Sequence, residues 1–178
     1  MRVRDHLALG TAGAALVIPW NPAAAAGLWA GSVLIDADHY LWFSLRNRRL
    51  SPLAAMRFFE QPNASRHAGS RVLHSPGALL VASALAVARP RMLAVAVGMG
   101  VHVALDAFHE ARLDRARAVA LRRDGSSCRG CGTCGPRVGT HLARQPWLLP
   151  DYGPENLVSL CEPCHERAHA AVEAGSWR

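Results

Sequence analysis

Lysine is absent from this chain of 178 residues, in which all twenty basic residues are arginine. The thirteen acidic residues leave a formal charge of +7 with histidine counted as neutral. Arginine stays charged and pairs bidentately with phosphate, so the charge makes anionic partners plausible. The chain is also rich in alanine, valine and leucine, and a compositional bias explains the arginines equally well. Charge alone therefore identifies no partner.

Cysteine is missing from residues 1–110, whereas residues 111–178 contain all five cysteines. The cysteines fall in CxxC pairs near histidines, a pattern typical of metal ligands in a reducing compartment rather than of a disulfide framework. No cleavable signal peptide is evident, because the first apolar run continues into Pro19 and Pro22 without a clear cleavage site.

Charged residues are missing from residues 7–35, and the prolines at 19 and 22 divide this run in two. Two more apolar stretches, 72–88 and 92–105, flank a short Arg-Pro-Arg break. We therefore expect four apolar helices in two hairpins, each shorter than the ~20 residues that span a bilayer comfortably. They are either short or tilted membrane helices or the core of a soluble bundle.

The distribution of arginine favours the membrane. With four crossings, the arginines near the start, those between the second and third helices and those after the fourth would all be cytoplasmic. We expect the chain in the inner (cytoplasmic) membrane, with its C-terminal domain in the cytoplasm. Residues 110–123 predict a helix with an Arg-rich face, interpreted as a solvated connector. The expected domains are residues 1–110 and 127–178, joined by an Arg-rich helical linker over 111–126.

Two CxxC knuckles in the C-terminal part predict a structural zinc site, with ligands Cys128, Cys131, Cys161 and Cys164. Cys134 overlaps the first knuckle and could replace Cys128, but is interpreted as a spare thiol. His165 and His169 share one face of a predicted helix, so both could reach a second ion. Because four cysteines already complete a tetrahedral zinc, this second site would be open and suited to a catalytic Mg²⁺, Mn²⁺ or Zn²⁺.

Residues 128–169, with CRGC, THL and ENLVSLCEPCHERAH, resemble zinc-stabilised HNH endonucleases. The resemblance implies a β-hairpin and a helix around one divalent ion, and hydrolysis of phosphodiester bonds in nucleic acid, with DNA expected. It assigns His141 as the general base, Asn156 as the residue that orients the hairpin loop, and His165 and His169 as metal ligands. Thr140 stands where the family has Asp or His as another ligand, and Asp151 is a candidate replacement. The alternative is a zinc module that binds nucleic acid without cutting it.

Polar residues inside apolar helices need a physical reason. Here they are His6, Asp36, Asp38, His39, His74, His102, Asp106 and His109. Several have helical spacing, and histidine with carboxylate is a ligand set for zinc, manganese or iron. The alternative is a buried polar network that stabilises the bundle.

Residues 1–110 resemble the membrane-bound, metal-dependent hydrolases of the bacterial inner membrane called YdjM-like. The resemblance lies in His6, in DADH (36–39), in RVLHS (71–75) and in HVALD (102–106). It implies a helical membrane domain with a divalent metal held by His6, Asp36, Asp38, His39, His74, His102 and Asp106. The sequence departs from the family's HRG-x-THS run around His67, which leaves the role of that residue open.

The sequence thus predicts a mainly α fold: a four-helix apolar membrane domain followed by a small ββα-metal domain with a structural zinc. The predicted function is that of an HNH-type endonuclease held at the membrane. In the enzyme alternative, the first domain hydrolyses a phosphoester or lipid-like substrate and the zinc module is accessory.

Overall fold

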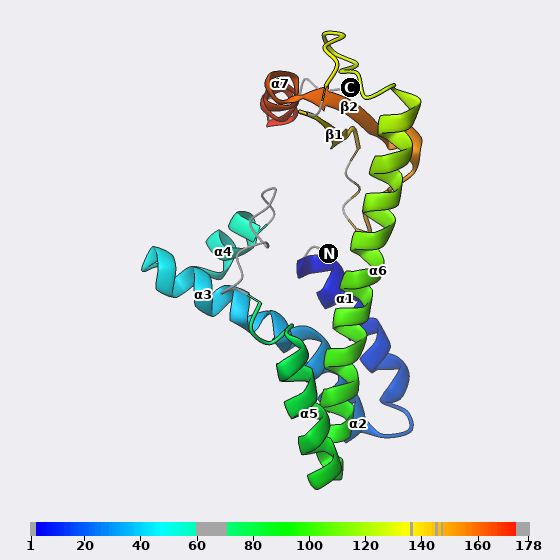
Figure 1. The fold of residues 1–178 in the computed structure, drawn as a ribbon. Coiled ribbons are helices and arrows are strands. Elements are labelled where there is room, and N and C mark those ends of the chain that lie inside the picture. Colours follow the sequence, from blue (N-terminus) through cyan, green and yellow to red (C-terminus); the bar gives the residue numbers. More distant parts are fainter. Residues whose placement is uncertain (1–2, 60–70, 136, 145, 147, 174–178) are drawn as a thin grey trace. The chain divides into compact units, whose positions relative to one another are not determined.

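The computed structural model describes residues 3–59, 71–135, 137–144, 146 and 148–173. The prediction of a mainly helical chain with a small two-stranded sheet is confirmed. The chain divides into two compact units, Met1–Ala107 and Phe108–Arg178, and the boundary falls within one long helix. Figure 1 shows the helices and strands of both units.

The first unit is built from helices. Their bounds are α1 Val3–Val17, α2 Pro22–Val33, η1 Leu34–Asp36, α3 Ala37–Asn47, α4 Pro52–Phe59, α5 Pro76–Ala88, η4 Pro90–Met92 and α6 Leu93–Arg123, of which the last continues into the second unit. Asn21 and Ser75 cap α2 and α5, where each side-chain oxygen accepts a hydrogen bond from a backbone N–H three residues on. A proline follows each cap, at a position where its missing N–H costs nothing.

Helices α2 and α6 approach each other at two glycines. A Cβ atom on Gly31 would lie 2.1 Å from the carbonyl oxygen of Val95, and one on Gly98 would lie 2.4 Å from that of Leu28. Small residues at such crossings let two helix backbones touch. The contact sets Ser32, the residue after Gly31, against the side of α6 that carries His102.

Four helices, α1, α2, α5 and α6, lie over the four apolar stretches that the sequence predicts, but the expectation that all four cross a membrane is not borne out. Among the described helices, one stretch, Pro90–Arg123, is long and apolar enough to cross a membrane, with a mean hydropathy of 1.5. Helix α5 is apolar but shorter, and prolines cut the first apolar run into helices below the ~20 residues that a span requires. In the most apolar 18-residue window of this stretch, 17% is buried, and the core helix of a soluble protein would meet the same criteria of length and composition.

The second unit contains the end of α6, an antiparallel hairpin and a final helix. The hairpin pairs β1 (Val138–Leu142) with β2 (Leu157–Cys161), after the short turn η5 (Pro154–Asn156), and α7 (Glu162–Glu173) follows directly. In this register His141 lies opposite Val158. One buried cluster joins Ala116, Ala120, Tyr152 and Leu157, and another joins Cys128, Leu160, Cys164 and Ala168.

Residues 111–123 form the last turns of α6, as the sequence predicts, and most of them are partly or fully exposed, but one side of the helix packs in the second unit. Ala116 and Ala120 are buried in the core of the second unit. At the end of α6, the Arg123 guanidinium donates to both oxygens of Asp124 (2.8 and 2.7 Å) and to the carbonyl oxygen of Leu157 (2.8 Å). The helix also runs unbroken from Leu93, because no proline interrupts it, so its last turns belong to the second unit.

Candidate metal centres

Four cysteines of the second unit converge, as the two CxxC knuckles predict. Their sulfur atoms lie within 4.8 Å of one another, and Cys131 Sγ is 3.5 Å from Cys161 Sγ. The backbone N–H of Gly130 donates to Cys128 Sγ (3.3 Å), and the Arg167 guanidinium donates to Cys164 Sγ (3.0 Å). Such N–H donors stabilise negative charge on sulfur. The cluster could bind a metal such as zinc.

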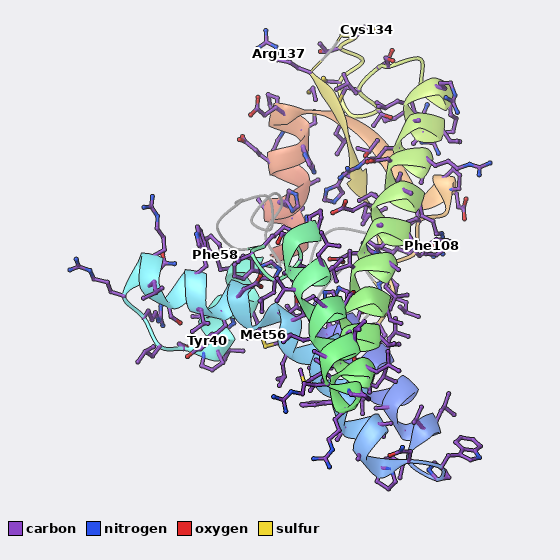
Figure 2. All side chains as sticks on the ribbon, turned by 60° about the horizontal axis from the view of Figure 1, so that its bottom comes forward. Tyr40, Met56, Phe58, Phe108, Cys134 and Arg137 are labelled. Atoms are coloured by element: carbon purple, nitrogen blue, oxygen red, sulfur yellow. The ribbon has the colours of Figure 1, made fainter. Side chains whose placement is uncertain are left out.

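The pKa values of these thiols also favour a cation bound between them. A hydrogen bond from the backbone of Cys161 lowers the pKa of the Cys128 thiol to about 6, so this residue is a thiolate at neutral pH. Burial raises the pKa of the Cys164 thiol to about 12. A second negative charge so close is unfavourable unless a cation compensates it. Cys134 lies outside this cluster, with its sulfur 2.9 Å from Ser127 Oγ, and Figure 2 labels it in the loop before β1.

Three histidines of the second unit form another group. His141 lies on β1, whereas His165 and His169 lie one turn apart on α7. Their ring centroids are 5.0 Å (His141 to His165), 4.8 Å (His141 to His169) and 4.7 Å (His165 to His169) apart. Imidazoles around one ion at ~2.1 Å from each nitrogen have centroids about 5 Å apart, so all three could reach a single ion.

The imidazole of His141 is neutral at physiological pH. Burial, with the neighbouring His165 and His169, lowers the pKa of His141 to about 4. Burial also lowers the pKa of His165. A neutral imidazole offers a lone pair, which a metal ion or a proton can take.

The loop between β1 and β2 is held by Asn156. Its buried amide donates to the carbonyl oxygens of Arg144 (2.8 Å) and Asp151 (2.9 Å) and accepts from the N–H of Arg144 (2.8 Å). Asn156 is therefore a positioning residue. Asp151 does not compensate for Thr140, because its carboxylate accepts the N–H of Gly153 and does not join the histidine group. Side chains alternate along a strand, which places Thr140 on the face of β1 opposite His141.

In the first unit, three candidate ligand atoms meet at His74, His102 and Asp36. Nε2 of His74 lies 3.0 Å from Nε2 of His102, and Asp36 Oδ1 lies 3.3 and 3.5 Å from these two nitrogens. Ligands at ~2.0–2.1 Å from a tetrahedral zinc are about 3.3 Å apart. The three separations thus match one face of a zinc coordination tetrahedron.

Neighbouring groups aim both imidazoles at this point. Nδ1 of His102 donates to the carbonyl oxygen of Ser32 (2.8 Å), because a carbonyl oxygen can only accept. Nδ1 of His74 lies 3.4 Å from Asp38 Oδ2, which also accepts the N–H of Leu73 (2.8 Å). Metal-ligating histidines commonly use one nitrogen in this way and keep the other for the ion.

The remaining predicted ligands surround this triad. Two further groups could hold an ion and share Asp36, one with His6 and His102 and one with His39 and His74. His6 Nε2 lies 3.0 Å from Asp106 Oδ1, and the His6 ring stacks on that of His102. Asp106 Oδ2 is 3.9 Å from His102 Nε2, within reach of the same ion after a small shift.

Asp38 and His109 differ from what was expected of the first unit. Asp38, predicted as a ligand, joins none of the candidate metal groups among the described residues: its Oδ2 accepts the Leu73 N–H and lies near Nδ1 of His74, and its Oδ1 lies 3.7 Å from Nδ1 of His39. His109 belongs to the second unit, where it bonds the hydroxyl of Tyr152. His67 lies outside the described residues.

Sequence reasoning missed Ser32 and gave Arg71 no role at the centre, although Arg71 donates to Asp106 Oδ2 (3.4 Å). Ser32 acts through its backbone carbonyl, which no residue pattern can reveal. Arg71, in contrast, immediately precedes the VLHS stretch, so its position gave a signal that could have been used.

Comparisons of the chain with protein-family models, with curated proteins and with solved structures find no match. They neither support nor contradict the two resemblances seen in the sequence.

Proposed function

We propose that the second unit is a divalent-metal-dependent endonuclease of the HNH type, acting on nucleic acid, with DNA as the expected substrate. The observation that carries the proposal is the meeting of His141, His165 and His169, contributed by a β-hairpin and by the helix that follows it. The four-cysteine cluster is formed by the loop before β1, the end of β2 and the start of α7, and could hold a structural zinc that replaces a larger core.

Each histidine has a role in this proposal. His165 and His169 hold the ion, and His141, neutral because of its low pKa, accepts the proton of the attacking water. A divalent ion would supply Lewis acidity and stabilise negative charge on the phosphate. Asn156 keeps the loop that follows His141 in place. Exposed arginines, including Arg129, Arg137 and Arg144, supply positive charge for phosphate contacts.

A plasmid-cleavage assay tests this function. The full chain in detergent micelles is compared with His141→Ala and with His102→Ala, in magnesium, manganese or zinc. We expect nicking that depends on the metal, disappears in His141→Ala and persists in His102→Ala. DNA binding without cleavage would select a non-catalytic nucleic-acid module, and equal nicking by all three proteins would reject the assignment.

The His/Asp cluster of the first unit supports a second candidate function, a membrane metal-dependent hydrolase. Its observation is the convergence of His74 Nε2, His102 Nε2 and Asp36 Oδ1. Apolar side chains such as Leu16, Leu80 and Val87 are mostly exposed, which suits contact with a bilayer. In this proposal the first unit lies in the inner membrane with the second unit on its cytoplasmic side. If this proposal holds, we expect a phosphoesterase activity that is lost in His102→Ala and retained in His141→Ala.

A further inference from the structure

An apolar pocket lies directly beside the His/Asp cluster of the first unit. Its volume is about 230 Å³, and its walls include Leu9, Gly13, Leu28 and Val101. His6 and His102 also line it, and these two residues belong to a candidate metal group with Asp36. One end of a molecule bound in this pocket would therefore lie against the His/Asp cluster.

The pocket has open space at one glycine. A Cβ atom on Gly13 would meet nothing within 4 Å, whereas one on Gly10 would lie 2.7 Å from Ser32 Oγ. Gly10 thus serves the close packing of α1 on α2, and Gly13 leaves the pocket open. A larger side chain at residue 13 would fill the pocket without disturbing a helix contact.

The other side of the cluster is apolar as well. A second cavity, of about 210 Å³, reaches Asp36 and His39 and is otherwise lined largely by apolar and aromatic side chains such as Met56 and Phe59. Tyr40, labelled with Met56 in Figure 2, also lines it. A sugar or nucleotide would leave its polar groups unpaired against such walls. An apolar chain would instead gain free energy by leaving water.

The first pocket also connects with exposed apolar surface. Val101 lines it and is 45% exposed, and Val97, one turn earlier on α6, is 48% exposed. On α1, Leu16 is 71% exposed. An apolar chain could thus enter from a bilayer without crossing a polar rim.

From these observations we propose that the pocket binds the hydrocarbon chain of a long-chain phosphoester and places its phosphate at the His/Asp cluster. This inference rests on the second candidate function and specifies its substrate class. In the reaction, the oxygen of water forms a bond to phosphorus, the bond from phosphorus to the long-chain alcohol breaks, and the departing alkoxide takes up a proton. No oxidant or reductant takes part.

Photocrosslinking tests the pocket independently of catalysis. The full chain, loaded with zinc in an amphipathic polymer, is irradiated with dodecyl phosphate that carries a diazirine on its chain, and labelled peptides are mapped by mass spectrometry. We expect labels on the parts of α1, α2 and α6 that line the pocket. Gly13→Leu should reduce this labelling at least about tenfold. Gly100→Leu is the matched control, because a Cβ there also meets nothing within 4 Å and residue 100 does not line the pocket.

A second measurement uses the unmodified chain. Excess dodecyl phosphate should compete with the probe, and butyl phosphate at the same concentration should not. Labels spread over the apolar surface, or equal competition by both phosphates, would overturn the pocket. Pocket labelling without any hydrolysis would retain the binding site and reject the hydrolase. Hydrolysis of long-chain phosphoesters that is unchanged in Gly13→Leu would retain the hydrolase and reject the pocket.

Discussion

Nε2 of His74 and Nε2 of His102 face each other at 3.0 Å. Both rings direct Nδ1 to oxygen acceptors, so in two neutral rings both Nε2 atoms would carry lone pairs and could not hydrogen-bond to each other. The carboxylate of Asp36 adds a negative charge beside them. A positive ion, either a metal or a proton, is therefore needed at this point, and the tetrahedral spacing favours the metal.

Measuring the metal content of single variants distinguishes the three candidate metal centres. We expect His102→Ala to lose the ion of the first unit and keep that of the cysteines, because the two centres share no residue. His169→Ala should lose only the ion of the histidine group in the second unit. Inductively coupled plasma mass spectrometry on the purified full chain gives the stoichiometry. A metal content equal in His102→Ala and the parent chain would show that a proton occupies the first site.

The cysteine cluster should be needed for the second unit to fold. Cys128→Ser removes a buried ligand, so zinc binding and the protection of the β1–β2 amides against hydrogen exchange should both be lost. Cys134→Ser is the matched control, because Cys134 lies outside the cluster and should leave both unchanged. Equal zinc content in the two variants would contradict the assignment of ligands.

The glycine contact between α2 and α6 should be intolerant of larger residues. Gly98→Val would place side-chain atoms against the backbone of Leu28 and Ser32, and we expect a loss of about 1–3 kcal/mol in the free energy of unfolding. The displaced Ser32 carbonyl would also release His102, so the metal affinity of the first unit should fall. Thermal unfolding and metal titration measure the two effects. Gly100→Val faces open space and should show neither of them.

The ion pair at the end of α6 predicts a pH dependence. The hydrogen bonds from Arg123, together with the N–H of Ser159, hold the pKa of Asp124 well below its usual range. A lowered folded-state pKa stabilises the fold above the unfolded value of about 4 and loses this contribution as pH falls below it. Asp124→Asn should therefore destabilise the hairpin at pH 7 by about 1–2 kcal/mol.

The same variant should differ little from the parent chain at low pH, where the carboxylate of the parent becomes protonated. Hydrogen exchange of the β1–β2 amides measures this difference. Comparing the two proteins at the same pH removes effects that they share, such as zinc release. A difference that grows as the pH falls would contradict the mechanism.

Local features of both centres followed from the sequence. The CxxC spacing brings two sulfurs together by itself, and residues four apart on a helix share a face, so Cys161, Cys164, His165 and His169 could be assigned from spacing alone. The prolines at 19, 22 and 90 likewise marked helix ends, because proline cannot continue a helix from within.

Tertiary structure decided the rest. Asp36, His74 and His102 are far apart in the sequence, and they meet because Gly31 and Gly98 let α2 and α6 touch. The role of Asp38 depends on which nitrogen of His74 it faces, and residue spacing does not specify that. Whether residues 111–126 pack or stay in solvent depended on Tyr152 and Leu157, against which Ala116 and Ala120 are buried. Spacing along the chain determines which side chains share a face, but packing between distant segments determines what that face meets.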